Sequence, residues 1–131
     1  MKISKIKVFF LIIVVLILVA FLTSAFKSVS KVQDTSGKYD AFATCLKNSG
    51  AIFYGASWCP HCKSEKSLFG SSESLLPYVE CSTPDGSKQT QICADKKIMG
   101  YPTWEFADGT RVNGEATLQM LAQKTACVLP Q

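Results

Sequence analysis

Two cysteines separated by two residues lie where an apolar run gives way to a polar segment. Residues 51–58 are apolar or small, and Cys59-Pro60-His61-Cys62 follows them directly. This pattern predicts a buried strand that leads into a helix, with proline at the first helical position, where its missing N–H is no loss. A helix N-terminus has unpaired N–H groups and a positive dipole end, and both favour a thiolate. The stretch therefore predicts a reactive dithiol.

The charge of the chain is balanced once its first residues are set aside. The formal net charge is +4, and Lys2, Lys5, Lys7 and Lys27 account for all of it, because from residue 28 onward ten basic residues match ten acidic ones. A neutral domain without a basic patch does not predict a nucleic-acid partner.

An apolar segment dominates the N-terminal part of the chain. Residues 8–22 are fifteen apolar residues in a row, between Lys7 and Lys27. As a helix, about 19 residues extend roughly 28 Å, close to the ~30 Å hydrocarbon core of a bilayer. We therefore predict that residues 1–27 form a lysine-rich cytoplasmic start and one transmembrane anchor, which places the rest outside the cytoplasm. A signal peptide cleaved near residues 23–25 is the alternative.

The remaining sequence predicts a polar, serine-rich linker at 28–37 and one α/β domain at 38–131. Apolar periodicity and turn residues set the expected elements of this domain. They are helices over 38–48, 60–69, 88–99 and 115–127, and strands over 51–56, 78–81, 103–106 and 110–112. Strands separated by helices favour parallel pairing, and Asp108-Gly109 predicts an antiparallel hairpin between the last two strands.

Two motifs give the domain a resemblance to a known fold. Trp58-Cys59-Pro60-His61-Cys62 and the later Tyr101-Pro102-Thr103 resemble the thioredoxin fold, over residues 38–129. Four further stretches are similar to the thioredoxin-like domain associated with bacterial and plant homologues of vitamin K epoxide reductase: 53–56, 66–70, 76–81 and 100–104. This resemblance implies a mixed sheet flanked by helices. It also implies that this chain is a separate, membrane-tethered redox partner of such a membrane enzyme. One spanning segment cannot itself form a multi-helix membrane enzyme.

The chemistry of the motif assigns roles to its residues. We expect Cys59, the more exposed thiol at the helix start, to be the nucleophile, Cys62 to resolve the mixed disulfide, and His61 to stabilise the Cys59 thiolate. A more stable thiolate makes a disulfide more oxidising, as the potentials of about −120 mV for DsbA and about −270 mV for thioredoxin illustrate. DsbA-type oxidants carry the same Pro-His dipeptide. An inert bridge or half of a zinc site is the alternative, and a single His in the chain disfavours zinc.

The second motif predicts how a client polypeptide binds. By similarity to thioredoxins, the Tyr101–Pro102 bond is expected to be cis, and Pro102 to set the register of the client. Tyr101 would present its backbone to an extended client beside Cys59, and Trp58 would pack over the motif. An ordinary proline at a strand entry is the alternative interpretation of Pro102.

One position departs from the thioredoxin pattern. Thioredoxins carry a buried acid on the strand six residues before the first motif cysteine, where this chain has Phe53. We therefore expect water or another group to handle the proton of Cys62. Glu105 is a candidate, although an exposed strand position is its favoured interpretation. Trp104 and Phe106 are expected to be core and rim residues.

The other four of the six cysteines are expected to be bridged, because disulfides persist outside the cytoplasm. Cys81 and Cys93 lie twelve residues apart around a Pro/Asp/Gly loop. The related domain places cysteines in a similar way, so we favour a bridge worth about 3 kcal/mol over an electron-relay pair. A bridge between Cys45 and Cys127 stays open, because the first and last helices of this fold tend to lie on opposite faces of the sheet.

Together these features predict a membrane-anchored thiol–disulfide oxidoreductase that faces the periplasm or the cell exterior. It would oxidise dithiols in exported proteins and be re-oxidised by a vitamin K epoxide reductase-like, quinone-linked membrane enzyme. The Cys59–Cys62 disulfide would be its redox group, with no bound cofactor and no metal. The alternatives are an extracytoplasmic reductase for cytochrome maturation or disulfide repair, and a non-catalytic binding or metal-delivery module.

Overall fold

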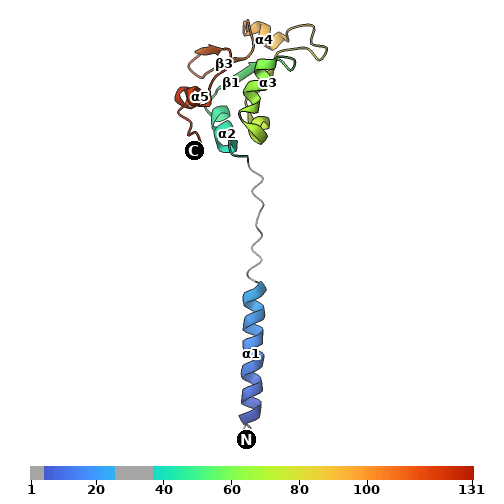
Figure 1. Ribbon diagram of the computed structural model, residues 1–131, viewed down its shortest axis with the longest axis vertical. Coiled ribbons are helices and arrows are strands. Elements are labelled where there is room, and N and C mark those ends of the chain that lie inside the picture. Colours follow the sequence, from blue (N-terminus) through green and yellow to red (C-terminus); the bar gives the residue numbers. More distant parts are fainter. Residues whose placement is uncertain (1–4, 26–36) are drawn as a thin grey trace. The chain divides into compact units, whose positions relative to one another are not determined.

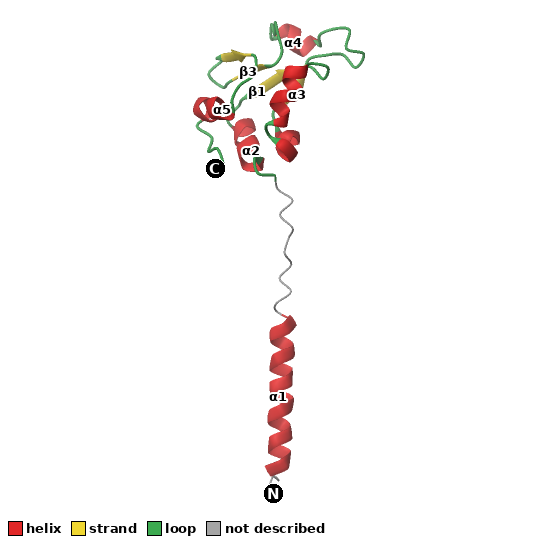
Figure 2. Cartoon of the chain, viewed as in Figure 1, coloured by secondary structure: helices red, strands yellow, loops and turns green. Residues whose placement is uncertain are grey.

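The computed structural model describes residues 5–25 and 37–131. The chain divides into two units, Met1–Asp34 and Thr35–Gln131, which are drawn in Figures 1 and 2. The linker predicted at 28–37 lies outside the described residues except for its last one, Gly37.

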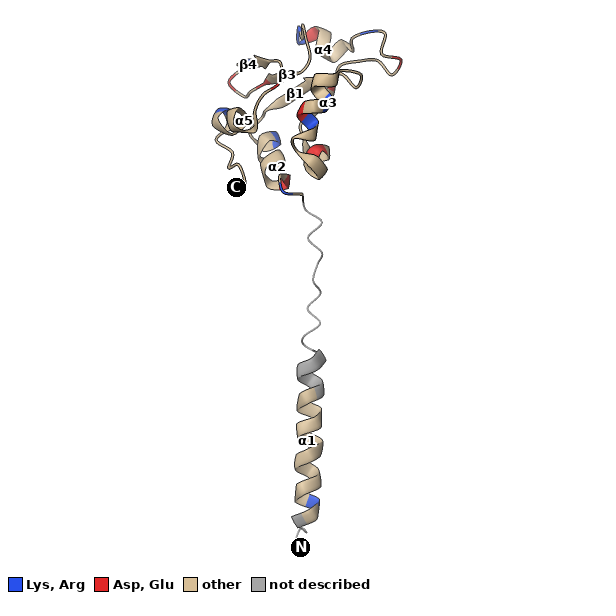
Figure 3. Cartoon of the chain, in the orientation of Figure 1, with Lys and Arg blue, Asp and Glu red and all other residues tan. Residues whose placement is uncertain are grey.

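The first unit contains helix α1, Lys5–Ala25. Figure 3 colours a position near its N-terminal end as Lys or Arg, and the rest of its described length as neither basic nor acidic. Its described side chains are those of residues 6–20, and they are almost all exposed. Within the part of the chain that the structure describes, no helix combines the length and the hydropathy that crossing a membrane requires. The predicted transmembrane helix is therefore not confirmed.

The second unit is built on a sheet of four strands in the order β2-β1-β3-β4. The strands are β1 (Ile52–Gly55), β2 (Tyr78–Glu80), β3 (Thr103–Glu105) and β4 (Arg111–Asn113). β1 pairs in parallel with β2 and antiparallel with β3, and β3 pairs antiparallel with β4. The prediction of an α/β fold with a mixed sheet is confirmed, but the expected parallel pairing holds only for β1 with β2 and is wrong for β1 with β3.

Helices cover this sheet (Figure 2). They are α2 (Asp40–Asn48), α3 (Pro60–Ser67), the 3-10 helix η1 (Gly70–Leu75), α4 (Gln91–Asp95) and α5 (Leu118–Thr125). The helix predicted over 88–99 is thus much shorter, and Lys97 beyond its end has a left-handed backbone with φ of 54°. The last helix begins later than predicted because the Thr117 side chain caps it by accepting a hydrogen bond from the Met120 N–H.

Strand β1 is buried on both faces of the sheet, as its unbroken apolar sequence predicts. Phe53 is buried on one face and stacks on Trp104 of β3, with ring centroids 4.9 Å apart. Tyr54, on the other face, joins a second buried cluster with Ile98 and the half-cystines of the 81–93 loop. The strand that leads into the dithiol motif is therefore held by packing from both sides.

Two disulfides join the four cysteines outside the motif. Cys81 is bonded to Cys93, the pairing that the sequence favours, and Cys45 is bonded to Cys127, the pairing that it leaves open. Residues of α2 and α5 pack into the same core cluster, together with Cys127. The expectation that the first and last helices of the domain lie on opposite faces is therefore wrong for this chain, and their proximity permits the bond.

Candidate active site

The motif cysteines lie at the junction of β1 and α3. Cys59 is the N-cap residue of α3, and Pro60 is its first residue. Both motif cysteines are free thiols, and the exposed fraction is 4% for Cys59 and 1% for Cys62. Both thiols are thus buried, and Cys59 is the more exposed of the two, as predicted.

That loop brings a second part of the chain to the dithiol. The Tyr101–Pro102 peptide bond is cis, and the Cys59 thiol donates a hydrogen bond to the Tyr101 carbonyl oxygen at 3.7 Å. The half-exposed Trp58 ring stands edge-on to the Tyr101 ring, with centroids 6.0 Å apart. Four residues that the sequence assigns to the site therefore lie together: Trp58, Cys59, Tyr101 and Pro102.

His61 points to a residue that sequence reasoning missed. Its Nδ1 lies 2.7 Å from an oxygen of Glu115, and the two side chains are 69% and 41% exposed. Ser64 donates a hydrogen bond to the other oxygen of Glu115 at 3.3 Å. An exposed pair of this kind adds little stability. Its effect is to orient the imidazole of the motif, and no local sequence pattern connects Glu115 with α3.

Cys62 lies behind the motif, against strand β1. A Cβ on Gly55 would stand 3.0 Å from Cys62 Sγ and 2.7 Å from the Tyr78 ring, so glycine is needed for this close approach. Burial, together with a hydrogen bond and charge from Cys59 and the charge of Glu65, raises the pKa of the Cys62 thiol to about 12. The inner thiol is therefore held protonated at neutral pH.

A buried carboxyl group lies one helical turn beyond Cys62. Glu65 is 0% exposed, and it accepts hydrogen bonds from Trp104 Nε1 at 2.6 Å and from the Ala116 N–H at 3.2 Å. Burial raises the pKa of Glu65 to about 7, although these hydrogen bonds act against the shift. Among the ion pairs of the described residues, none involves Glu65.

The sequence carried a signal for Glu65 that we did not use. On a helix, residues three apart share a face, so a buried Cys62 implies that Glu65 points inward as well. Because glutamate is charged, its residue type predicts an exposed position for Glu65 instead. Helical spacing was the better guide here.

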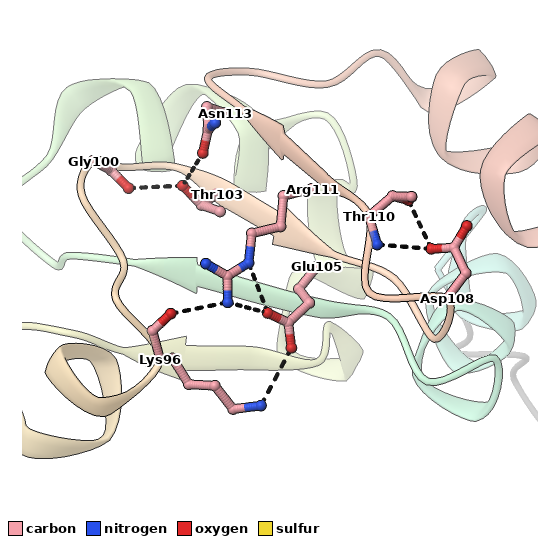
Figure 4. A network of polar contacts seen from close by, with 8 residues as sticks. All are labelled: Lys96, Gly100, Thr103, Glu105, Asp108, Thr110, Arg111 and Asn113. Atoms are coloured by element: carbon pink, nitrogen blue, oxygen red, sulfur yellow. Dashed lines mark hydrogen bonds and ion pairs between the residues drawn. The ribbon is translucent and has the colours of Figure 1, made fainter.

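Glu105, the candidate proton acceptor of the sequence analysis, faces away from the dithiol. Trp104 points to the α3 side of the sheet, and Glu105, its neighbour on β3, points to the other side. Glu105 is paired there with Lys96 and Arg111 (Figure 4). Burial acts to raise the pKa of Glu105, but its bonds and charge attraction with these two cations outweigh burial and lower it. The suggestion that Glu105 serves Cys62 is therefore wrong.

Comparison with known proteins agrees with the site and the fold. The family model described as Thioredoxin matches residues 30–126. The thiol-disulfide oxidoreductase LTO1 of Arabidopsis thaliana is 42% identical to the chain over 108 residues, which cover 78% of this chain and 28% of that protein. The chain thus corresponds to less than a third of the length of this relative. It belongs to the thioredoxin family, and the paired thiols of Cys59 and Cys62 are its candidate site for thiol–disulfide exchange.

Proposed function

We propose that this chain introduces disulfides into exported proteins outside the cytoplasm. One observation carries the proposal: the cysteines away from the motif are bonded as two disulfides, whereas Cys59 and Cys62 are free. Stable structural disulfides are typical of proteins outside the cytoplasm. A free pair at a helix start, beside a backbone carbonyl that a client strand can approach, is suited to exchange.

The exchange proceeds through a mixed disulfide. A client thiolate attacks Cys59 Sγ of the oxidised motif, the Cys59–Cys62 bond breaks, and Cys62 leaves with the electron pair and takes up a proton. A second client thiolate then attacks the client sulfur, which forms the client disulfide and releases Cys59. Two electrons have passed from the client to the motif. Tyr101 and Pro102 hold the client strand. The imidazole of His61, which Glu115 orients, stabilises the negative charge on the Cys59 sulfur.

The proposal extends to the partners of the dithiol and to its place in the cell. Re-oxidation by a vitamin K epoxide reductase-like membrane enzyme, with a quinone as final acceptor, is supported by the likeness of residues 76–81 and 100–104 to the domain associated with such enzymes. Anchoring at the membrane, with the domain on the outer side, is supported by the apolar residues 8–22 and by the lysines before them.

Replacing Cys62 with alanine in the full chain is expected to trap both kinds of partner in cells. Without the resolving thiol, Cys59 stays bonded to whatever attacks it, so mixed disulfides accumulate. Non-reducing gels and mass spectrometry should identify exported cysteine-containing proteins and a multi-spanning quinone enzyme. The Cys59→Ala, Cys62→Ala double variant is the control, and it should trap neither. Capture of neither partner by the single variant would exclude the oxidase pathway.

A reductase, acting in cytochrome maturation or disulfide repair, is the second candidate. The observation that favours it is the pair of free thiols, Cys59 and Cys62, because the dithiol is the form from which a reductant donates electrons. Equilibration with glutathione decides between the two directions. A potential near −120 mV indicates the oxidant that we propose, and one near −270 mV indicates the reductant.

A further inference from the structure

We propose that Glu65 is the group that exchanges a proton with Cys62 when the motif disulfide opens and closes. This inference rests on the proposed thiol–disulfide exchange and assigns one step of it to a residue outside the motif. The assignment starts from an unusual feature: a carboxyl group buried in the core that makes no ion pair with any described residue, on the helix that Cys59 caps and Cys62 belongs to.

The fold holds Glu65 and Cys62 under the same face of β1. The two residues lie three apart on α3, a spacing that puts Cβ atoms about 5–6 Å from each other. Both side chains are buried. Cys62 lies against Gly55, and the indole that donates to Glu65 stacks on Phe53, which shares that face of the strand with Gly55. The carboxyl and the thiol are therefore neighbours in one enclosed region.

The surroundings of Glu65 leave both of its protonation states accessible. Its oxygens accept N–H groups from Trp104 and Ala116, and these bonds are retained by a carboxylate and largely by a neutral carboxyl. Besides burial, the charge of Glu115 acts to raise the pKa of Glu65, and the charge of Glu65 in turn acts on Cys62. With burial raising the pKa of Glu65 to about 7, the group gives or takes a proton near neutral pH, where general acid–base transfer is most efficient.

A second pair of titratable groups approaches Cys62, and it is less suited to the task. The Tyr78 hydroxyl lies 3.3 Å from the position a Gly55 Cβ would occupy, and it donates to Glu80 at 2.9 Å. Burial and Glu80 raise the pKa of Tyr78. Burial also acts to raise the pKa of Glu80, but hydrogen bonds from Ser82, Tyr78 and the Ser57 N–H outweigh it and lower that pKa. Tyr78 thus stays protonated and Glu80 ionised at neutral pH, so neither exchanges a proton there.

The proposed step balances in both directions. When a client thiolate attacks Cys59 Sγ, the Cys59–Cys62 bond breaks, the electron pair goes to Cys62 sulfur, and that sulfur takes the proton of the Glu65 carboxyl. When the motif closes again, the Cys62 thiol returns its proton to the Glu65 carboxylate. The sulfur then attacks Cys59 in the mixed disulfide and displaces the other thiolate.

The test is the Glu65→Gln variant of the full chain, which keeps the shape and an acceptor oxygen of the side chain. Closure of a mixed disulfide between Cys59 and a small aromatic thiol is followed by stopped-flow absorbance from pH 5 to 9. We expect the closure rate to fall at least about tenfold near pH 7, and its inflection near that pH to disappear. Alkylation of Cys59 in a Cys62→Ala background, which does not involve the inner thiol, is expected to change little.

Two control variants make the result specific. Glu73→Gln makes the same chemical change at an exposed position of η1, and it should leave the closure rate as in the parent chain. Tyr78→Phe removes the competing hydroxyl. A pH profile that changes in Tyr78→Phe and not in Glu65→Gln overturns the inference, and so does a Glu65→Gln rate that is unchanged, or lowered equally at every pH.

Outcomes for the parent chain separate this inference from the proposed function. A parent chain that performs no exchange overturns both, whereas an active parent with an unaffected Glu65→Gln variant overturns this inference alone. If Glu65→Gln does not fold, infrared spectra of the parent chain replace it. The carboxyl band is then expected to titrate at a different pH in the dithiol and disulfide forms. Identical titration in the two forms contradicts the proposal.

Discussion

The Cys45→Ala, Cys127→Ala double variant is expected to lose about 4.5 kcal/mol of unfolding free energy, because the bond closes a long loop. The sequence separation between the two cysteines is 82 residues. In the chain-entropy account of disulfides, the stabilisation grows with the logarithm of loop length, since a longer loop restricts the unfolded chain more. Urea unfolding without reductant, in a Cys59→Ala, Cys62→Ala background for both parent and variant, measures the loss.

The second disulfide of the domain provides the matched comparison. Cys81 and Cys93 are separated by 12 residues, so the Cys81→Ala, Cys93→Ala double variant should lose only about 3 kcal/mol. Both variants remove two half-cystines that are buried or partly buried. The difference between their losses of unfolding free energy therefore reports the effect of loop length. A greater loss from the shorter loop would contradict the entropic account for this chain.

Stability is expected to fall as the pH rises from about 4.5 to about 7, because folding raises the pKa of Glu65 from 4.5 to about 7. The folded state binds this proton more tightly than the unfolded state. The stabilisation that this proton gives the folded state is therefore fully present below the unfolded pKa of Glu65, and it is lost as the pH rises through the folded pKa. This difference between the folded and unfolded pKa of Glu65 corresponds to roughly 3 kcal/mol of unfolding free energy. Urea unfolding at pH 5 and pH 8 measures it.

The Glu65→Gln variant isolates this effect, since an amide does not titrate. Its unfolding free energy should change much less between pH 5 and pH 8 than that of the parent chain. Glu80 and Glu105 do not obscure the comparison: their pKa values are lowered by folding, so their stabilisation is lost only as the pH falls below about 4.5. Equal pH dependence in the two proteins would show that Glu65 is not the group responsible.

The sequence predicted the parts of the molecule that depend on local pattern. The apolar run before the dithiol gave a strand buried on both faces, and Pro60 marked the first residue of α3. The two motifs that define the site lie far apart in the chain. Their meeting, which brings Cys59 to the Tyr101 carbonyl, was expected through resemblance to a fold and not through any pattern in the residues themselves.

Contacts between distant residues escaped prediction for physical reasons. Glu115 meets His61 only because the connection between β4 and α5 passes beside α3. Glu65 was overlooked because a charged side chain in a core is rare, and only the geometry shows the N–H groups of Trp104 and Ala116 that make its burial tolerable. Glu105 has a carboxyl group that could accept the proton of Cys62. The alternation of side chains along β3 places it on the face of the sheet away from the dithiol.

The Cys45–Cys127 bond has a consequence for how the domain responds to proteases. It ties a residue of the first helix of the domain to one just past the last helix, so nearly the whole fold lies within one covalent ring. A single cut anywhere between these cysteines leaves two pieces that migrate together until a reductant separates them. After such a cut, the integrity of the domain thus depends on a disulfide that lies outside the Cys59–Cys62 motif.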